Sequence, residues 1–161
     1  MKAPLPQRRH LPHEMPPWVE AGATFFVTVC CQPRRANQPC HRTTADTIFE
    51  SVSFRQHRLD WHVSLLVLMP DHLHFLVSFP NDASLRKTIL SWKALIARKT
   101  GVRWQRDFFD HRLRSDESFE EKAQYIRRNP VRAGLVSIAA NWEFMWEPNI
   151  GGAGRPALPT F

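Results

Sequence analysis

Residues 61–79, WHVSLLVLMPDHLHFLVSF, read as two strands joined by a tight turn. The first half, residues 61–69, is an almost unbroken apolar run, which is typical of a buried strand. Pro70-Asp71 is a turn dipeptide, and it predicts that the second strand folds back beside the first. From residue 72 the side chains alternate, so that one face carries His72 and His74 and the other is wholly apolar. We therefore expect an antiparallel hairpin whose histidine face lies opposite the main core.

The segments around this hairpin predict the rest of an α+β domain. They read as a strand, an amphipathic helix, the hairpin, a second helix that ends near Gly101, a short strand or loop, and a third helix that begins at a Ser118 capping box and stops at Pro130. The boundaries are 24–31 for the first strand, 43–58 for the first helix and 108–114 for the short strand or loop. This order predicts a ferredoxin-like antiparallel sheet with two helices on one face and an extra C-terminal helix over part of the other.

The two ends of the chain differ from the middle in composition. Residues 1–20 are rich in proline and carry Arg8 and Arg9, which predicts an extended basic arm. Residues 21–147 hold all the predicted elements and form the expected domain. Residues 148–161 are rich in glycine and proline, and we expect a flexible tail.

The charge balance favours a polyanion as partner. The 161 residues include 22 Lys and Arg against 15 Asp and Glu, a formal net charge of +7. Such an excess favours binding to phosphates, although an ordinary basic surface is the alternative. The longest apolar run, from Leu65 to Pro70, is too short to cross a membrane. The three cysteines contain no CxxC pair, so we expect a reduced, cytoplasmic protein without a structural zinc site.

The pair His72 and His74 is the first candidate for chemistry. Two imidazoles on one face of a strand, one pleat apart, can converge on a single divalent metal. Two protein ligands leave such a site open, which suits catalysis better than a structural role. The alternative is a pair of histidines that simply face solvent.

Tyr125, the only tyrosine in the chain, is the second candidate. A phenol attacks phosphate when nearby cations or a metal favour its phenolate form. Asn129 lies four residues later, so a continuous helix would bring its amide oxygen to the same face as a third, hard metal ligand. Pro130 weakens that alignment, because a residue before proline is biased away from helical geometry. The alternative is a tyrosine packed on the sheet and an asparagine that caps the helix.

Residues 83–106 form a basic run without any Asp or Glu. Its cations are Arg86, Lys87, Lys93, Arg98, Lys99, Arg103 and Arg106. Such a run can follow a phosphate backbone, although a solvated helix face is the common alternative. Trp104, Phe108 and Phe109 lie beside it, and they would stack on unpaired bases if exposed or join the core if buried.

Three segments resemble the single-tyrosine HUH transposases of the insertion-sequence 200 type. They are MPDHLHFLV at 69–77, WQRDFFDHR at 104–112 and YIRRNPVRAGLV at 125–136. The N-terminal RRHLPH at 8–13, followed by GATFFVT at 22–28, resembles the subgroup associated with repetitive extragenic palindromes (REP). The resemblance spans residues 8–146 with the order and spacing of the segments preserved.

The resemblance implies an enzyme that cuts and joins single-stranded DNA beside hairpins. Tyr125 would form a 5′-phosphotyrosine link, and His72, His74 and Asn129 would hold Mg²⁺ or Mn²⁺. The residues expected to contact DNA are Arg8, Arg9, Arg86, Lys87, Lys93, Arg106, Arg127 and Arg128. We expect a monomer, with a dimer as the alternative. Two other functions stay open: a non-catalytic module that binds single-stranded nucleic acid on the same fold, and a metal-dependent hydrolase that uses only the histidines.

Overall fold

The expected hairpin forms the middle of a five-stranded sheet. The computed structural model describes residues 16, 18–19, 22–114 and 118–148. The elements in chain order are β1 (Thr24–Cys30), α2 (Arg42–His57), β2 (His62–Met69), β3 (His72–Ser78), α3 (Leu85–Thr100), β4 (Phe109–Arg112), α4 (Phe119–Arg127), α5 (Asn129–Arg132), the 3₁₀ turn η1 (Ala139–Asn141) and β5 (Met145–Trp146). The strand order is β4-β1-β3-β2-β5, and all neighbours are antiparallel. The predicted ferredoxin-like α+β fold is confirmed, with β5 as an added edge strand that the sequence did not predict.

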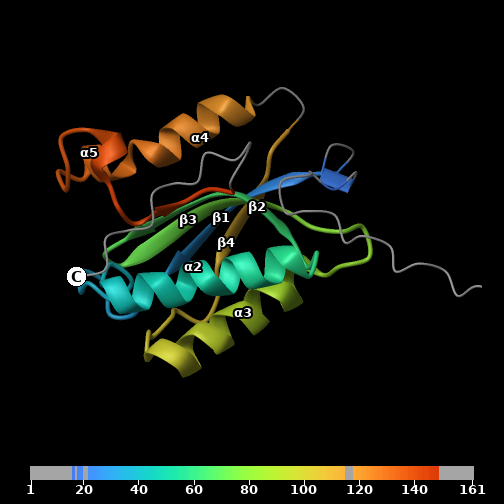
Figure 1. Ribbon diagram of the computed structural model, residues 1–161, viewed down its shortest axis with the longest axis horizontal. Helices are drawn as coiled ribbons and strands as arrows, with labels where there is room; N and C mark the ends of the chain where they lie inside the picture. Colours follow the sequence, from blue (N-terminus) through green and yellow to red (C-terminus); the bar gives the residue numbers. More distant parts are fainter. Residues whose placement is uncertain (1–15, 17, 20–21, 115–117, 149–161) are drawn as a thin grey trace, which may run out of the picture.

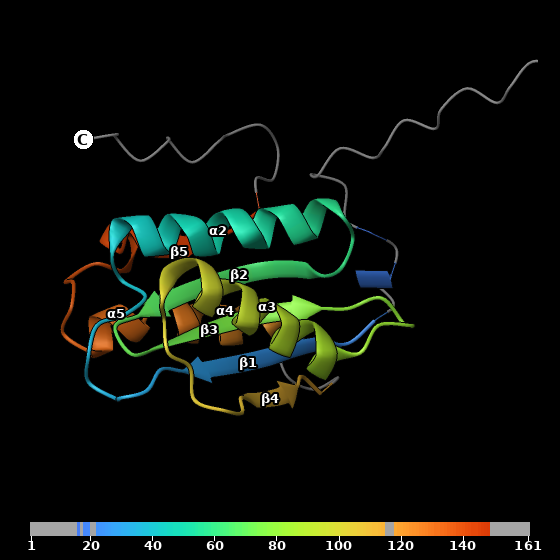
Figure 2. The ribbon, with the colours of Figure 1, turned by 90° about the horizontal axis from the view of Figure 1, so that it is seen from below.

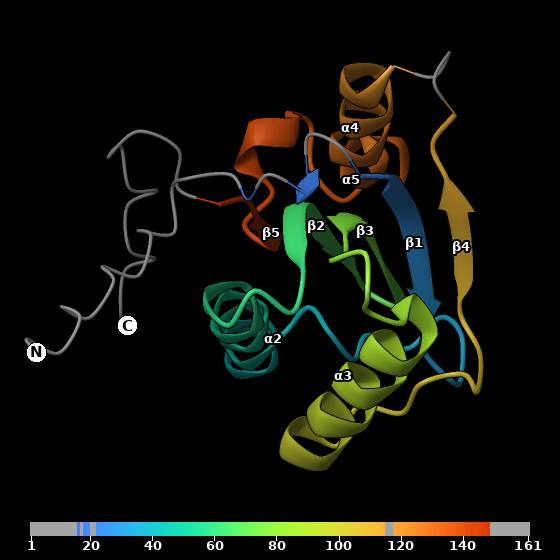
Figure 3. The ribbon, with the colours of Figure 1, turned by 90° about the vertical axis from the view of Figure 1, so that its right-hand side faces the viewer.

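The helices form two layers on opposite faces of this sheet. Helices α2 and α3 cover one face, and α4 and α5 cover the other (Figures 1 and 3). Figure 2 looks onto the α2 and α3 side, with the sheet behind. The third helix therefore covers the histidine face, as its amphipathic sequence and its place after the sheet predict.

The main core lies between the sheet and the α2–α3 layer. Trp61, Phe75 and Trp92 are buried there, and their ring centroids lie 5.6–6.1 Å apart in edge-on or tilted contacts. The indole Nε1 of Trp92 donates a hydrogen bond of 2.9 Å to Ser51 Oγ, which links α3 to α2. The apolar face of β3 belongs to this core, so the alternation read from the sequence placed the two faces correctly.

Serine side chains cap the starts of two helices, the predicted cap at Ser118 and a second one at Ser84. The side chain of Ser84 accepts a hydrogen bond from the backbone N–H of Lys87 at the start of α3. The side chain of Ser118 accepts from the N–H of Glu121 at the start of α4. Each serine satisfies a donor that the first turn of a helix leaves without a partner.

Pro130 does not stop the third helix where the sequence indicated. Helix α4 ends at Arg127, and the short helix α5 begins at Asn129 with Pro130 in its first turn. A proline is tolerated at that position because its missing N–H would have no helical partner there. Gly134, with φ +73°, lies just beyond the end of α5. The predicted single helix is therefore a pair of helices.

Some of the expectations lie outside the described residues. That part of the chain includes Arg8 and Arg9 of the basic arm and the tail from residue 149.

The three cysteines, Cys30, Cys31 and Cys40, are all free thiols. Among the residues described, no helix is both long enough and apolar enough to cross a membrane.

Candidate active site

His72 and His74 lie on the α4 side of β3, with their ring centroids 4.7 Å apart. Nδ1 of His72 donates to Asp71 Oδ1 at 2.7 Å, and Nδ1 of His74 hydrogen-bonds to Thr28 Oγ1 at 2.8 Å. Each ring thus uses Nδ1 in a hydrogen bond that fixes its orientation, which makes Nε2 the candidate metal ligand of each. Metal-binding histidines are commonly held in this way by a carboxylate or another polar group.

Asp71 is itself held in place from the loop after β1. Arg34 Nε lies 3.1 Å from Asp71 Oδ2, and the backbone N–H of Arg35 donates to the same oxygen at 2.9 Å. Burial acts to raise the pKa of Asp71, but hydrogen bonds from His72 and Arg35 and the charge of Arg34 outweigh it and lower the pKa. The carboxylate is therefore charged when it orients His72.

His74 is neutral at neutral pH. Burial is the largest cause that lowers its pKa to about 3, and the charges of His72, Arg132, Arg34 and Lys122 act in the same direction. A neutral imidazole is the form that binds a metal, so no proton has to leave His74 first.

The donor set fits a divalent metal bound in an open site. No group of three or more His, Cys, Asp or Glu side chains that could hold a metal occurs in the described part of the chain. Two imidazoles would therefore need oxygen ligands from an amide, water or substrate to complete the coordination. That arrangement suits a catalytic metal, which keeps positions free for substrate.

Tyr125 lies on α4 with 52% of its surface exposed. The guanidinium carbon of Arg132 lies 4.0 Å from the centre of its ring, and Lys122 Nζ lies 5.6 Å from it. The ring borders a shallow recess of about 360 Å³ lined by Glu120, Glu121, Gln124, Tyr125, Arg128 and Arg132. A polymeric substrate can therefore reach the phenol.

Lys122 connects the tyrosine to the histidine pair. Its Nζ lies 4.9 Å from the centre of the Phe26 ring as well as beside Tyr125. The Phe26 ring in turn stacks on the imidazole of His74, with centroids 5.3 Å apart and an interplanar angle of 25°. These contacts place the helix that carries Tyr125 over the strands that carry the candidate metal ligands (Figure 1).

Asn129 lies one turn beyond Tyr125, at the start of α5. Its Oδ1 accepts a hydrogen bond from Nη2 of Arg132, which also donates to the backbone oxygen of Tyr125 at 2.7 Å. An amide oxygen has two lone pairs, so this contact leaves one for a metal. The structure thus brings Asn129 beside Tyr125 despite the break in the helix, with Arg132 as the connection.

Lys93, which the sequence analysis expects to contact DNA, is buried in the structure and not exposed on the surface. Only 5% of the residue is exposed. Its Nζ donates to three backbone oxygens, those of residues 105, 106 and 107, at 2.8, 3.2 and 3.1 Å. The sequence held a signal for this role, because Lys93 falls within the buried helical stripe of Ile89, Trp92 and Ile96.

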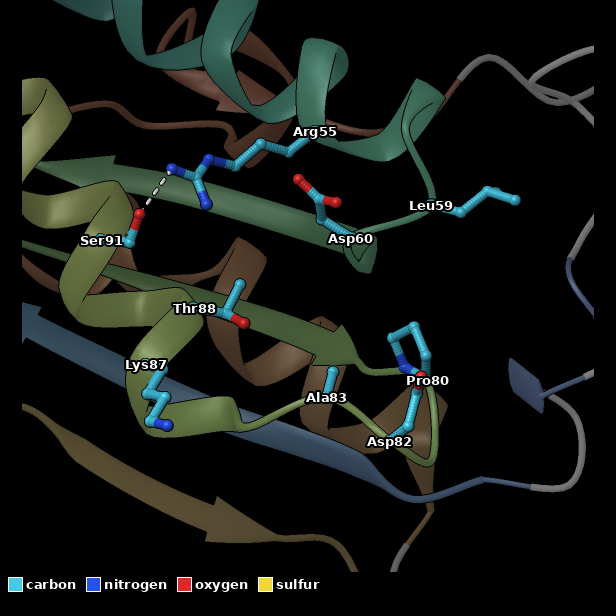
Figure 4. Close-up of a pocket in the computed structure, with 9 residues that line it drawn as sticks. All are labelled: Arg55, Leu59, Asp60, Pro80, Asp82, Ala83, Lys87, Thr88 and Ser91. Carbon is cyan, nitrogen blue, oxygen red and sulfur yellow. Dashed lines mark hydrogen bonds between the residues drawn. The ribbon is translucent and has the colours of Figure 1, made fainter.

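Two other basic residues of the run 83–106 lie away from the histidine face. Arg86 and Lys87 are on α3, across the sheet from α4, and Arg86 pairs with Asp107 at 3.3 Å. Lys87 lines a second pocket of about 390 Å³, where Arg55 reaches across from α2 to Ser91 Oγ at 3.1 Å (Figure 4). Arg106 is exposed in the connection between α3 and β4.

Arg127 and Arg128 lie at the end of α4 but in different surroundings. Arg127 forms ion pairs with Glu120 and Glu147, whereas Arg128 lines the recess beside Tyr125.

Four residues of the site were not assigned from the sequence: Thr28, Asp71, Lys122 and Arg132. Lys122 precedes Tyr125 by three residues and Arg132 follows it by seven. On a helix this spacing brings residues to one face, so it was the available sequence signal that both lie near Tyr125.

Comparison with known proteins places the chain beside the REP-associated tyrosine transposases, and it confirms the resemblance that the sequence motifs indicated. A REP-associated tyrosine transposase of Escherichia coli K12 is 25% identical over 127 residues, covering 76% of this chain and 75% of the relative. A Haemophilus influenzae protein assigned to the same family is 25% identical over 143 residues, covering 76% of this chain and 78% of its own. No family model matches the chain.

A solved structure shares the fold. The structure of a REP-associated tyrosine transposase bound to a REP hairpin aligns with a TM-score of 0.66 and 21% identity, covering 86% of this chain and 94% of that one. This likeness establishes the architecture.

Proposed function

We propose that this protein is a transposase-like enzyme that cleaves and rejoins single-stranded DNA at hairpin sequences through a 5′-phosphotyrosine intermediate on Tyr125. The observation that carries the proposal is the contact series from His74 through Phe26 and Lys122 to Tyr125. It joins a nucleophile and a candidate metal site on one face of the sheet. The names of the two bacterial relatives support the same activity.

The proposed reaction is a transesterification. Tyr125 Oη gives up its proton to solvent water as it attacks the scissile phosphorus, the phosphorus–tyrosine bond forms, and the bond to the 3′ oxygen breaks. The 3′ oxygen takes up a proton and leaves as a free hydroxyl. Attack by another 3′-hydroxyl reverses these changes and releases the tyrosine, so that joining needs no external energy source.

The protein's own groups orient and hold the reacting phosphate. Asp71 and Thr28 fix the two imidazoles, and Lys122 and Arg132 supply positive charge beside Tyr125 for the phosphate oxygens. Mg²⁺ or Mn²⁺, held by His72 and His74 with Asn129 as the candidate third ligand, would polarise the scissile phosphate when bound. Positioning of the phenol and phosphate together is the other contribution to rate.

The proposed substrate is single-stranded DNA with a hairpin. The related transposase of known structure is bound to a REP hairpin, which supports this choice. Arg128 lies beside Tyr125 and is available to contact the strand near the cleavage position. By the family resemblance, Arg8 and Arg9 would contact the bases next to the hairpin, and the active form would be a monomer.

The proposal is tested with labelled hairpin oligonucleotides and Mg²⁺ or Mn²⁺. We expect a covalent protein–DNA adduct that survives denaturation, and we expect Tyr125→Phe to abolish it while keeping DNA affinity. His72→Ala and His74→Ala should also abolish it, as should a chelator. Binding without an adduct under any metal would instead identify a non-catalytic binding module. Cleavage that persists in Tyr125→Phe without any adduct would identify a hydrolase that uses only the histidines.

A further inference from the structure

Phe109 is an exposed aromatic residue on the same face of the sheet as the histidine pair. It lies on the edge strand β4 with 58% of its surface exposed. Phe109 stands opposite Thr28 of β1, and Thr28 stands opposite His74 of β3. The three residues therefore form one row across the sheet. Two strand spacings, roughly 10 Å, separate the backbone at Phe109 from that at His74.

Aromatic rings fill the space between these two positions. The His74 ring stacks on Phe26 at 5.3 Å, and the Phe26 ring meets Phe109 edge-on at 6.4 Å. Phe26 is buried under the ammonium of Lys122, whereas the outermost ring, that of Phe109, is open to solvent. The row thus begins at the candidate metal site and ends in an exposed flat apolar surface.

The neighbouring aromatic residues of this segment have internal roles. Trp104 stacks on Trp92 with centroids 6.3 Å apart, and its Nε1 donates to the backbone oxygen of Lys93 at 3.0 Å. Phe108 lies under Lys93 Nζ, 5.9 Å from its ring centre. Packing against the core accounts for both of these partly buried residues, but it does not account for Phe109.

We propose that Phe109 is a stacking platform for a base of the single strand, one or two nucleotides from the phosphate held at His72 and His74. This inference rests on the proposed function and adds a base-binding position to it. Stacking on an aromatic ring accepts any base, and a cation beside it holds the backbone. Lys122, above Phe26, supplies that cation between the platform and the candidate metal site.

The test compares two single-stranded probes on variants of the full chain. One is a fluorescent thymidine 20-mer, and the other is an abasic oligomer of the same length, which keeps the phosphates and lacks the bases. We expect Phe109→Ala to weaken binding of the thymidine probe about tenfold and to leave the abasic probe unchanged. Phe109→Trp should bind the thymidine probe at least as tightly as the unchanged protein.

Phe54→Ala is the matched control. Phe54 is 60% exposed but lies on α2, on the opposite face of the sheet, so its loss should change neither affinity. Equal effects of Phe109→Ala on both probes, or none, would overturn the inference. The inference would also be overturned if Phe109→Ala changed the oligomeric state on gel filtration but left binding of the thymidine probe intact. That result would identify Phe109 as a protein–protein contact. The Tyr125 adduct assay tests the proposed function separately. If the unchanged protein bound no DNA at all, both the proposed function and the inference about Phe109 would be refuted.

Discussion

The guanidinium carbon of Arg132 lies over the Tyr125 ring, 4.0 Å from its centre, and Nη2 of the same group donates to the carboxamide oxygen of Asn129. One cation from α5 therefore orients both the candidate nucleophile and the candidate third metal ligand. A planar, delocalised cation can stack and donate at the same time, which an ammonium group cannot do.

We expect Arg132→Lys to slow adduct formation about 10- to 100-fold, because lysine keeps the charge but loses the stacked fork that sets the geometry. Single-turnover formation of the protein–DNA adduct measures this effect. Arg128→Lys, in the same recess, is the control and should retain most of the rate. A normal rate in Arg132→Lys would show that charge alone suffices.

Thr28→Val should weaken Mn²⁺ binding about 10- to 100-fold, because His74 loses the hydrogen bond that fixes its ring. Titration followed by electron paramagnetic resonance or calorimetry measures the affinity. The matched control is Thr24→Val, on the same strand and face, whose hydroxyl contacts Ser78 at 3.3 Å at the far end of β3. Equal Mn²⁺ affinities in both variants would contradict a role for Thr28 in holding the ligand.

Lys93→Met should lower the free energy of unfolding by about 2 kcal/mol or more, because three backbone oxygens lose a charged donor. Urea denaturation measures the change. Lys87→Met, at an exposed position of the same helix, should shift stability by less than about 0.5 kcal/mol. Unchanged stability with weakened DNA binding in Lys93→Met would restore the interpretation from the sequence.

The free energy of unfolding should fall as the pH drops below about 6.5, the ordinary pKa of histidine. Burial lowers the pKa of His62, so the unfolded chain takes up a proton in this range while the folded protein does not. The loss begins near 6.5 and continues down to the folded pKa, and His74 contributes in the same direction.

Denaturation curves at pH 7, 6 and 5 test this dependence. His62→Gln should flatten it, because the variant has one fewer group to protonate on unfolding. His57→Gln, at an exposed position near the end of α2, is the control and should follow the unchanged protein. Identical slopes for His62→Gln and the unchanged protein would contradict the buried neutral histidine.

The local elements could be predicted from the sequence because their signals are local. Alternation along 72–78 separates the histidines from the apolar core residues. Gly101 marks a helix end through its backbone conformation, and Ser118 marks a helix start through its side-chain oxygen. The element order then limits the topology to a ferredoxin-like sheet. His72, His74 and Tyr125 were proposed from the chemistry of their side chains before any contact between them was known.

The contacts between distant segments were decided only by tertiary packing. Lys93 and Arg86 carry the same charge on one helix, yet the loop at 105–107 makes the first a buried structural cation and leaves the second exposed. Phe108 and Phe109 are adjacent and identical, and the strand register alone determines which of them faces the histidine side at the sheet edge. Lys122 lies three residues from Tyr125 in the chain, but only the packing of α4 on the sheet brought it over Phe26, which stacks on His74. Burial and strand register depend on contacts between residues far apart in the chain. The composition and spacing of a single segment therefore cannot predict them.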